Sequence, residues 1–74
     1  MAIPRHLQNI TPAKIIAARQ RAKVTQAEAA TIARLGATAR WGEYETGART
    51  PDVARFELFL ILTDQHPHYR VLKR

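Results

Sequence analysis

Residues 25–47 (TQAEAATIARLGATARWGEYETG) form the stretch that most restricts how this chain can fold. In the opening pattern Thr-Gln-Ala-Glu, the Thr25 hydroxyl can accept the amide proton three residues on, while the Glu28 carboxylate reaches back. This capping box predicts a helix start. Gly36 and Gly47 predict a tight turn and a helix end, because glycine adopts positive φ without strain. The two helices expected here cover about residues 26–34 and 38–46.

One further helix is expected on each side of this stretch. Thr11-Pro12 predicts a start, since Thr caps free amides and Pro at the first helical position loses no hydrogen bond. Thr50-Pro51 repeats that pattern, and Pro67 prevents a helix from continuing. The two flanking helices are expected over about residues 12–22 and 51–63. The predicted fold is therefore a small all-α domain of the four-helix type, spanning residues 1–74.

Small and apolar side chains at helical spacing predict the core. The residues expected to face inward are Ile15, Ala18, Arg19, Ala22, Ala29, Ala30, Ala33, Ala37, Trp41 and Tyr44. Trp41 is interpreted as a core side chain rather than one that stacks on a base. Gly42 lies in mid-helix, where glycine costs about 1 kcal/mol relative to alanine, so a close approach is expected there.

The last helix and the two chain ends allow more than one interpretation. Residues 53–62 are apolar on more than one helical face, which indicates a partner surface in addition to core. Residues 1–10 are expected to form an extended arm, with Arg5 and His6 either reaching a partner or fraying. The tail HYRVLKR is compatible with a short strand, a docked segment or a disordered basic end.

Composition limits the class of partner. Twelve Lys and Arg face six Asp and Glu, a formal charge of +6, which favours nucleic acid first and an anionic membrane second. No apolar run approaches the roughly 20 residues that span a bilayer, and no secretory signal is recognisable, so a cytoplasmic location is expected. With no cysteine in 74 residues, disulfides cannot reinforce the core, and association into a homodimer is expected instead.

Catalysis has no support in the sequence. His66 and His68 lack the spacing of a zinc pair, and there is no cysteine to complete a metal site. Glu43 and Glu45 point to different sides of their helix, and no phosphate loop or nucleophile motif is present. We expect neither an enzyme nor a small-molecule substrate, cofactor or metal.

The motif TQAEAA, followed after a turn by WGEYETGARTP, resembles the Cro/lambda-repressor-like, Xre-type helix-turn-helix family of phage, plasmid and bacterial regulators. The resemblance spans about residues 11–63 and implies a fold in which the helix at residues 38–46 enters the major groove of DNA. It also implies that Arg19 and Glu45 form a buried ion pair between the first and third helices. The chain departs from the family pattern by one extra residue between Gln26 and Glu45, and Lys23 replaces the glycine usual before the second helix.

The resemblance further implies which residues contact DNA. Gln26 corresponds to a glutamine that contacts phosphate and braces the recognition helix. Thr38, Ala39 and Glu43 correspond to positions that face base edges, with Arg40 beside them. Thr46 and Arg49 correspond to the loop that grips the backbone. The chemistry agrees, because Ala can contact a thymine methyl, Arg can bond guanine and Glu can accept from cytosine N4.

The expected function is that of a sequence-specific regulator of transcription. A repressor, autoregulatory or not, would occupy promoter double-stranded DNA, and a homodimer would bind an inverted-repeat operator. The alternative is an antitoxin or adaptor that acts through protein contacts of residues 51–63 and the tail.

Overall fold

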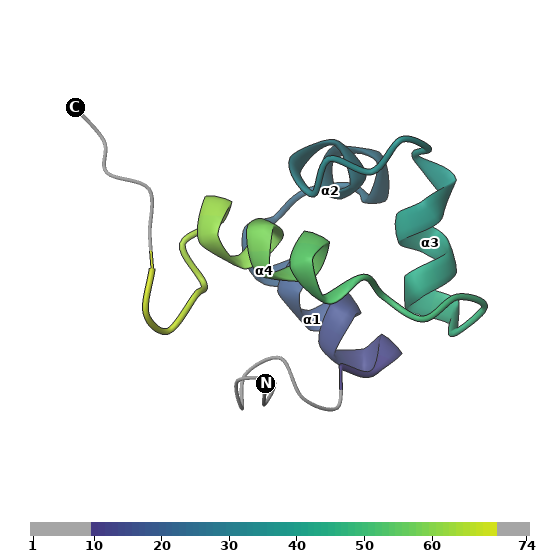
Figure 1. The fold of residues 1–74 in the computed structure, drawn as a ribbon. Helices are drawn as coiled ribbons and strands as arrows, with labels where there is room; N and C mark the ends of the chain where they lie inside the picture. The colour runs from purple at the N-terminus through teal and green to yellow at the C-terminus, as the bar shows by residue number, and fades with distance from the viewer. Residues whose placement is uncertain (1–9, 70–74) are drawn as a thin grey trace.

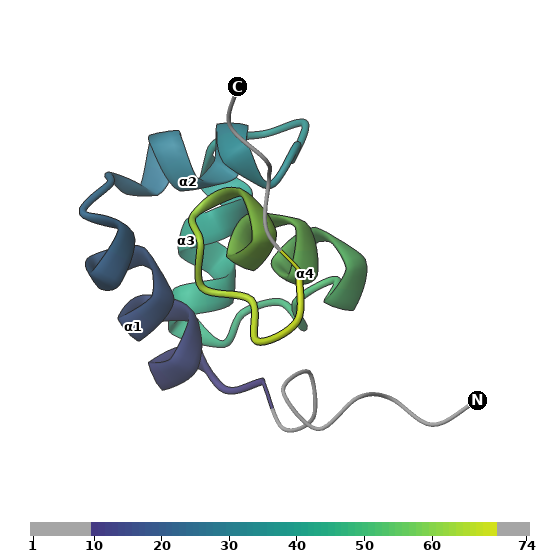
Figure 2. The same cartoon turned by 90° about the vertical axis from the view of Figure 1, so that its left-hand side faces the viewer.

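A computed structural model describes residues 10–69, which contain four helices and no strand. The helices are α1 (Pro12–Ala22), α2 (Gln26–Ile32), α3 (Ala39–Thr46) and α4 (Val53–Leu62). The all-α prediction is confirmed, whereas the expected arm at residues 1–9 and most of the tail, residues 70–74, lie outside the described residues. In Figure 1, α4 lies centrally, with α2 above it, α1 below it and α3 at one end; Figure 2 gives the view turned by 90°.

The helix starts follow the sequence prediction in α1 and α2 but not in α4. The Thr11 and Thr25 hydroxyls accept amide protons as expected, and the capping box with Glu28 is complete. The prediction that this helix starts at Thr50-Pro51 was wrong, since α4 begins at Val53. The reason is Asp52, whose carboxylate Oδ1 accepts the amides of Ala54 (2.9 Å) and Arg55 (3.3 Å) and thus caps two free donors.

Three helices close with a left-handed residue that is not glycine. The amides of Val24, Leu35 and Gln65 each bond a carbonyl five residues back, at 3.5, 2.9 and 2.8 Å. The residues preceding them are Lys23, Arg34 and Asp64, with φ of 58°, 61° and 62°. This closure ends α2 and α4 earlier than the predicted residues 34 and 63. It also corrects the assignment of the turn to Gly36, because the positive φ lies at Arg34 and an added Cβ at Gly36 would meet nothing within 4 Å. The expected helix end at Gly47 is present, at φ 83°.

The core consists of the inward faces of all four helices. Its buried residues are Ile15, Ala18, Ala29, Ala30, Ala33, Trp41, Tyr44, Phe56, Phe59 and Leu60. The three alanines from the α2 region let neighbouring helices approach closely, and the Trp41 and Phe59 rings pack with centroids 4.7 Å apart. Ala37, expected to be buried, is exposed because it precedes α3 in the turn.

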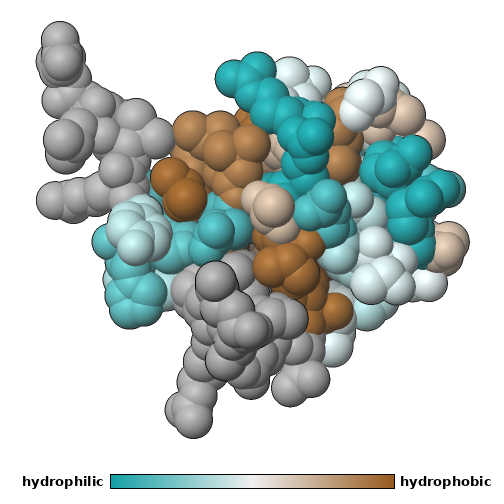
Figure 3. All heavy atoms as spheres, viewed as in Figure 1, coloured by the Kyte–Doolittle hydropathy of each residue, from teal (hydrophilic) through white to brown (hydrophobic). Residues whose placement is uncertain are grey.

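The segment after α4 folds back against the helices. The Gln65 side-chain amide donates to the carbonyl of Ala18 at 2.9 Å, and His66 contacts Glu57 of α4 at 3.1 Å. Leu62 is 43% exposed beside this segment. In the face drawn in Figure 3, apolar surface gathers over α4 and α2, whereas the α3 end is largely hydrophilic. On this face, the surface over α4 is therefore more apolar than the surface at the α3 end.

Candidate nucleic-acid interface

The outward face of α3 brings together the side chains expected to face base edges. Trp41 and Tyr44 are 1% and 4% exposed, so they turn α3 to a single orientation in which Ala39 and Thr46 point to solvent. Glu43 lies between them on the same face, with its side chain 41% exposed. Because α3 stands at one end of the molecule, this face is not covered by another helix (Figure 1). We refer to Thr38, Ala39, Glu43 and Thr46 as the α3 face.

Thr38 precedes α3 without capping it. Its backbone is already helical, at φ −62° and ψ −33°, and its side chain makes no capping hydrogen bond. The first amides of α3 therefore lack a side-chain partner, unlike those of the other three helices. One of them, the amide of Arg40, donates to the backbone carbonyl of Ala37 at 3.1 Å instead. Amides that stay unpaired at a helix start favour an anionic or acceptor group.

Two arginines flank Glu43. The Nε atoms of Arg40 and Arg49 each lie 3.4 Å from Glu43 Oε1, one from the preceding turn of α3 and one from the loop that follows it. All three side chains are between 38% and 48% exposed, so the pairs are screened by water and contribute little to stability. Their effect is geometric, since one carboxylate holds two guanidinium groups beside the α3 face.

The loop after α3 is folded against the end of that helix. The Thr46 hydroxyl donates to the Glu43 carbonyl at 3.2 Å and accepts the amide of Ala48 at 3.4 Å. The Arg49 amide also reaches the Glu43 carbonyl, at 3.4 Å. Gly47, in the left-handed region, permits this return. The loop thus carries Arg49 back to the edge of the α3 face.

Gln26 joins the start of α2 to α3. Its Nε2 donates to Glu45 Oε1 at 2.9 Å, and a Cβ added to Gly42 would lie 3.3 Å from its Oε1. The close approach expected at Gly42 is therefore present, and the side chain that approaches is Gln26. This contact fixes α3 against the start of α2. The phosphate contact expected of Gln26 stays a prediction.

The carboxylate of Glu45, a partly buried residue, fixes α3 from the inner side. Glu45, with 7% of its side chain exposed, accepts Arg19 Nε at 2.5 Å and Nη2 at 3.3 Å, and the indole Nε1 of Trp41 at 2.8 Å. Arg19 also donates to the carbonyl of Val24 at 3.2 Å. The ion pair implied by the family resemblance is thus present and is extended by two further donors, Trp41 and Gln26.

This environment shifts the pKa of both charged groups. Burial alone would raise the pKa of Glu45, but the hydrogen bonds from Arg19, Gln26 and Trp41 and the charge of Arg19 lower it below its ordinary value of 4.5. The hydrogen bond to Glu45 raises the pKa of Arg19. Both groups are therefore charged at neutral pH, and α1, α2 and α3 are connected through one carboxylate.

Sequence reasoning missed the donation from Trp41 to Glu45. The two residues are four apart, a spacing that puts side chains side by side on a helix and could have revealed the contact. The pairing of Arg49 with Glu43 had no comparable signal, because it depends on the path of the loop.

Comparisons of this chain with protein-family models, curated proteins and solved structures gave no match. Within residues 10–69, no helix has the length and apolar character needed to cross a membrane. The same residues contain no group of three or more His, Cys, Asp or Glu side chains placed to hold a metal ion.

Proposed function

We propose that this protein is a sequence-specific double-stranded DNA-binding regulator of transcription of the Xre type, and not an enzyme. The observation that carries the proposal is the exposed α3 face, flanked by Arg40 and Arg49 and backed by buried Trp41 and Tyr44. A single helix with short polar and small side chains fits the major groove, and Arg49 beside it supplies a phosphate contact. The net charge of +6 supports a polyanionic partner.

In this proposal Thr38, Ala39 and Glu43 face base edges with Arg40 beside them. Gln26, Thr46 and Arg49 contact the backbone. A rigid connection between the reading helix and the body is needed for a fixed register on the duplex. The Glu45 network supports that requirement, since it ties α3 to Arg19 of α1 and Gln26 of α2.

We further propose that the protein acts in the cytoplasm as a homodimeric repressor of a phage, plasmid or similar operon. Two copies would bind inverted half-sites about 34 Å apart, one helical turn of DNA, and repress by occupying the promoter. The exposed Leu62 and the apolar side of α4 support a self-association surface away from α3.

Footprinting on DNA that flanks the protein's own gene tests this function. We expect protection of two half-sites on one face of the duplex, competed poorly by random DNA. Salt-dependent binding of equal strength to every sequence would instead indicate a non-specific DNA-binding protein.

The exposed Leu62 also favours a second candidate, an antitoxin or adaptor that binds another protein through α4 and the tail. The repressor and the adaptor predict different oligomeric states and different affinities for DNA. A monomer in gel filtration with no affinity for its flanking DNA would support the adaptor and contradict the repressor.

A further inference from the structure

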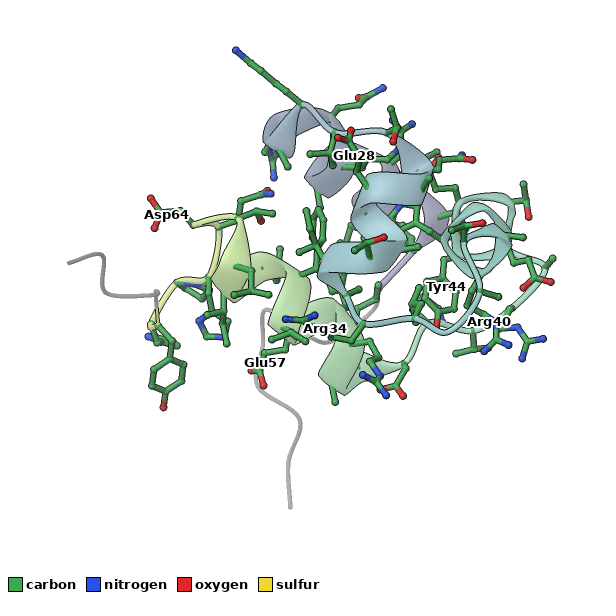
Figure 4. All side chains as sticks on the ribbon, turned by 90° about the horizontal axis from the view of Figure 1, so that it is seen from above. Glu28, Arg34, Arg40, Tyr44, Glu57 and Asp64 are labelled. Atoms are coloured by element: carbon green, nitrogen blue, oxygen red, sulfur yellow. The ribbon has the colours of Figure 1, made fainter. Side chains whose placement is uncertain are left out.

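Four arginines surround an open hollow beside α3. The hollow has a volume of about 380 Å³ and lies between the turn after α2, α3 and the start of α4. Its charged and aromatic lining includes Arg34, Arg40, Tyr44, Arg49, Asp52 and Arg55. Three of these, Arg34, Tyr44 and Arg40, are labelled in Figure 4, where they follow one another from the end of α2 to α3. The hollow shares Arg40 and Arg49 with the flank of the α3 face but extends away from it.

Arg34 and Arg55 give the hollow its unpaired positive charge. Among residues 10–69, neither guanidinium group has a hydrogen-bond or ion-pair partner. Arg34 is also held at φ 61°, a backbone conformation that an arginine adopts only at a cost. The ending of α2 therefore delivers this side chain to the rim of the hollow.

The carboxylates near the hollow are already engaged. Asp52 Oδ1 accepts two amides at the start of α4, and Glu43 Oε1 lies between Arg40 and Arg49. Those two pairs use the Nε atoms of the arginines, so their terminal nitrogens keep donors for another acceptor. Four guanidinium groups thus face two carboxylates, which leaves an excess of positive charge in a concave site.

We propose that this hollow is a binding site for a phosphate group. Guanidinium groups present forked donors that match phosphate oxygens, and four of them line this one hollow. Tyr44 lines the hollow and its hydroxyl has no partner within the described residues, so it is a further donor.

Two sources can supply the phosphate. One is the backbone of DNA bound at α3, and this source rests on the proposed function. The other is a free phosphorylated molecule, which would compete with a DNA strand for Arg40 and Arg49. The chemistry recognised is the same, so separate measurements must distinguish them.

The first measurement titrates the full chain with inorganic phosphate at constant ionic strength, with chloride as the reference anion. Amide and arginine Nε signals in nitrogen-15 spectra report the site. We expect saturable shifts at Arg34, Gly36 and Arg55. The double variant Arg34→Gln/Arg55→Gln should weaken the binding about tenfold or more, because hydrogen bonds to charged groups are of that order.

The matched control is Arg21→Gln/Lys23→Gln. It removes the same charge, and its Lys23 (φ 58°) matches Arg34 (φ 61°) in backbone conformation. All four substituted positions are exposed, and the amide spectrum verifies that each variant is folded. The control should retain phosphate binding.

The second measurement compares the salt dependence of DNA binding. If DNA supplies the phosphate, the Arg34/Arg55 variant loses about one unit of the slope of log K against log salt. Phosphate binding with an unchanged slope assigns the site to a free ligand.

The proposal is overturned if this variant loses no more than the control in both measurements. If the unaltered protein binds no DNA, the proposed function fails while the phosphate titration still stands.

Discussion

The indole Nε1 of Trp41 donates a 2.8 Å hydrogen bond to the carboxylate of Glu45, one turn further along α3. Trp41 is a core residue, packed on Phe59 of α4, whereas Glu45 is the acceptor for Arg19 of α1 and Gln26 of α2. The contact therefore joins the apolar core to the polar network, so that the position of α3 depends on all three other helices. A helix held in this way presents its outer face as a rigid surface.

Glu45→Gln should destabilise the fold and flatten its response to acid. The lowered pKa of Glu45 means that the folded state holds this proton less tightly than the unfolded state. The stabilisation is thus fully present above about pH 4.5 and is lost as pH falls through the folded pKa. We expect a loss of about 2 kcal/mol at neutral pH, since an ion pair with limited exposure is broken.

Urea unfolding followed by circular dichroism at several pH values between neutral and acid measures this effect. Asp64→Asn, which removes the same charge at an exposed position, is the control. An acid response equal to that of the unaltered protein would show that Glu45 is not the titrating group.

Lys23→Gly should stabilise the protein by about 0.5–1 kcal/mol. Glycine removes the strain of a side chain in the left-handed conformation, and this gain exceeds the extra conformational entropy that glycine gives to the unfolded chain. Lys23 has φ 58° at the end of α1, the place where the family pattern has glycine. Arg21→Gly, two residues earlier inside α1, should instead destabilise by about 1 kcal/mol. Thermal unfolding of both variants measures the contrast, and a loss of stability in Lys23→Gly would mean that the lysine side chain is needed for packing.

Gly42→Ala should raise the free energy of unfolding more in the Gln26→Ala variant than in the unaltered protein. A Cβ at residue 42 would lie 3.3 Å from Gln26 Oε1, so the glutamine must shift and strain its bond to Glu45. Without that side chain, the helix gains the full preference for alanine, about 1 kcal/mol. A double-mutant cycle of unfolding free energies measures the coupling. No coupling would mean that Gly42 is not kept by this contact.

Arg49→Ala should weaken binding to all DNA sequences and lower the salt slope by about one unit. The Arg49 guanidinium is held beside the α3 face by Glu43, where a duplex backbone would pass. Fluorescence anisotropy over a range of salt concentrations measures the slope. An unchanged slope would remove Arg49 from the phosphate contacts.

Arg40→Ala and Glu43→Ala should each reduce binding to the true site by about 1–3 kcal/mol, with little effect on random DNA. Both side chains lie at the α3 face and contact each other at 3.4 Å. Competition binding with operator and random duplexes separates the two effects. Equal losses on both DNAs would remove the two residues from base reading.

Much of the local structure could be predicted from the sequence. Thr11-Pro12 and the capping box of Thr25 and Glu28 mark helix starts because their bonds join residues only three apart. The inward face of α3 follows from spacing as well, since Trp41 and Tyr44 share one side of a helix. The sequence also determined the mid-helix glycine as a point of close approach, through its unfavourable helix propensity.

Only the tertiary structure decided which residues meet across the helices. Arg34 rather than Gly36 takes the left-handed conformation, so that the amide of Leu35, which packs against the core, bonds the carbonyl of Ala30 at 2.9 Å. The approach of Gln26 to Gly42, the joining of Arg40 and Arg49 by Glu43, and the hollow with Arg34 and Arg55 all depend on how helices and loops are packed. Local hydrogen bonds join residues that are close along the chain, so a sequence pattern is enough to predict them. The contacts between helices form only after packing of the core has fixed the positions of the helices.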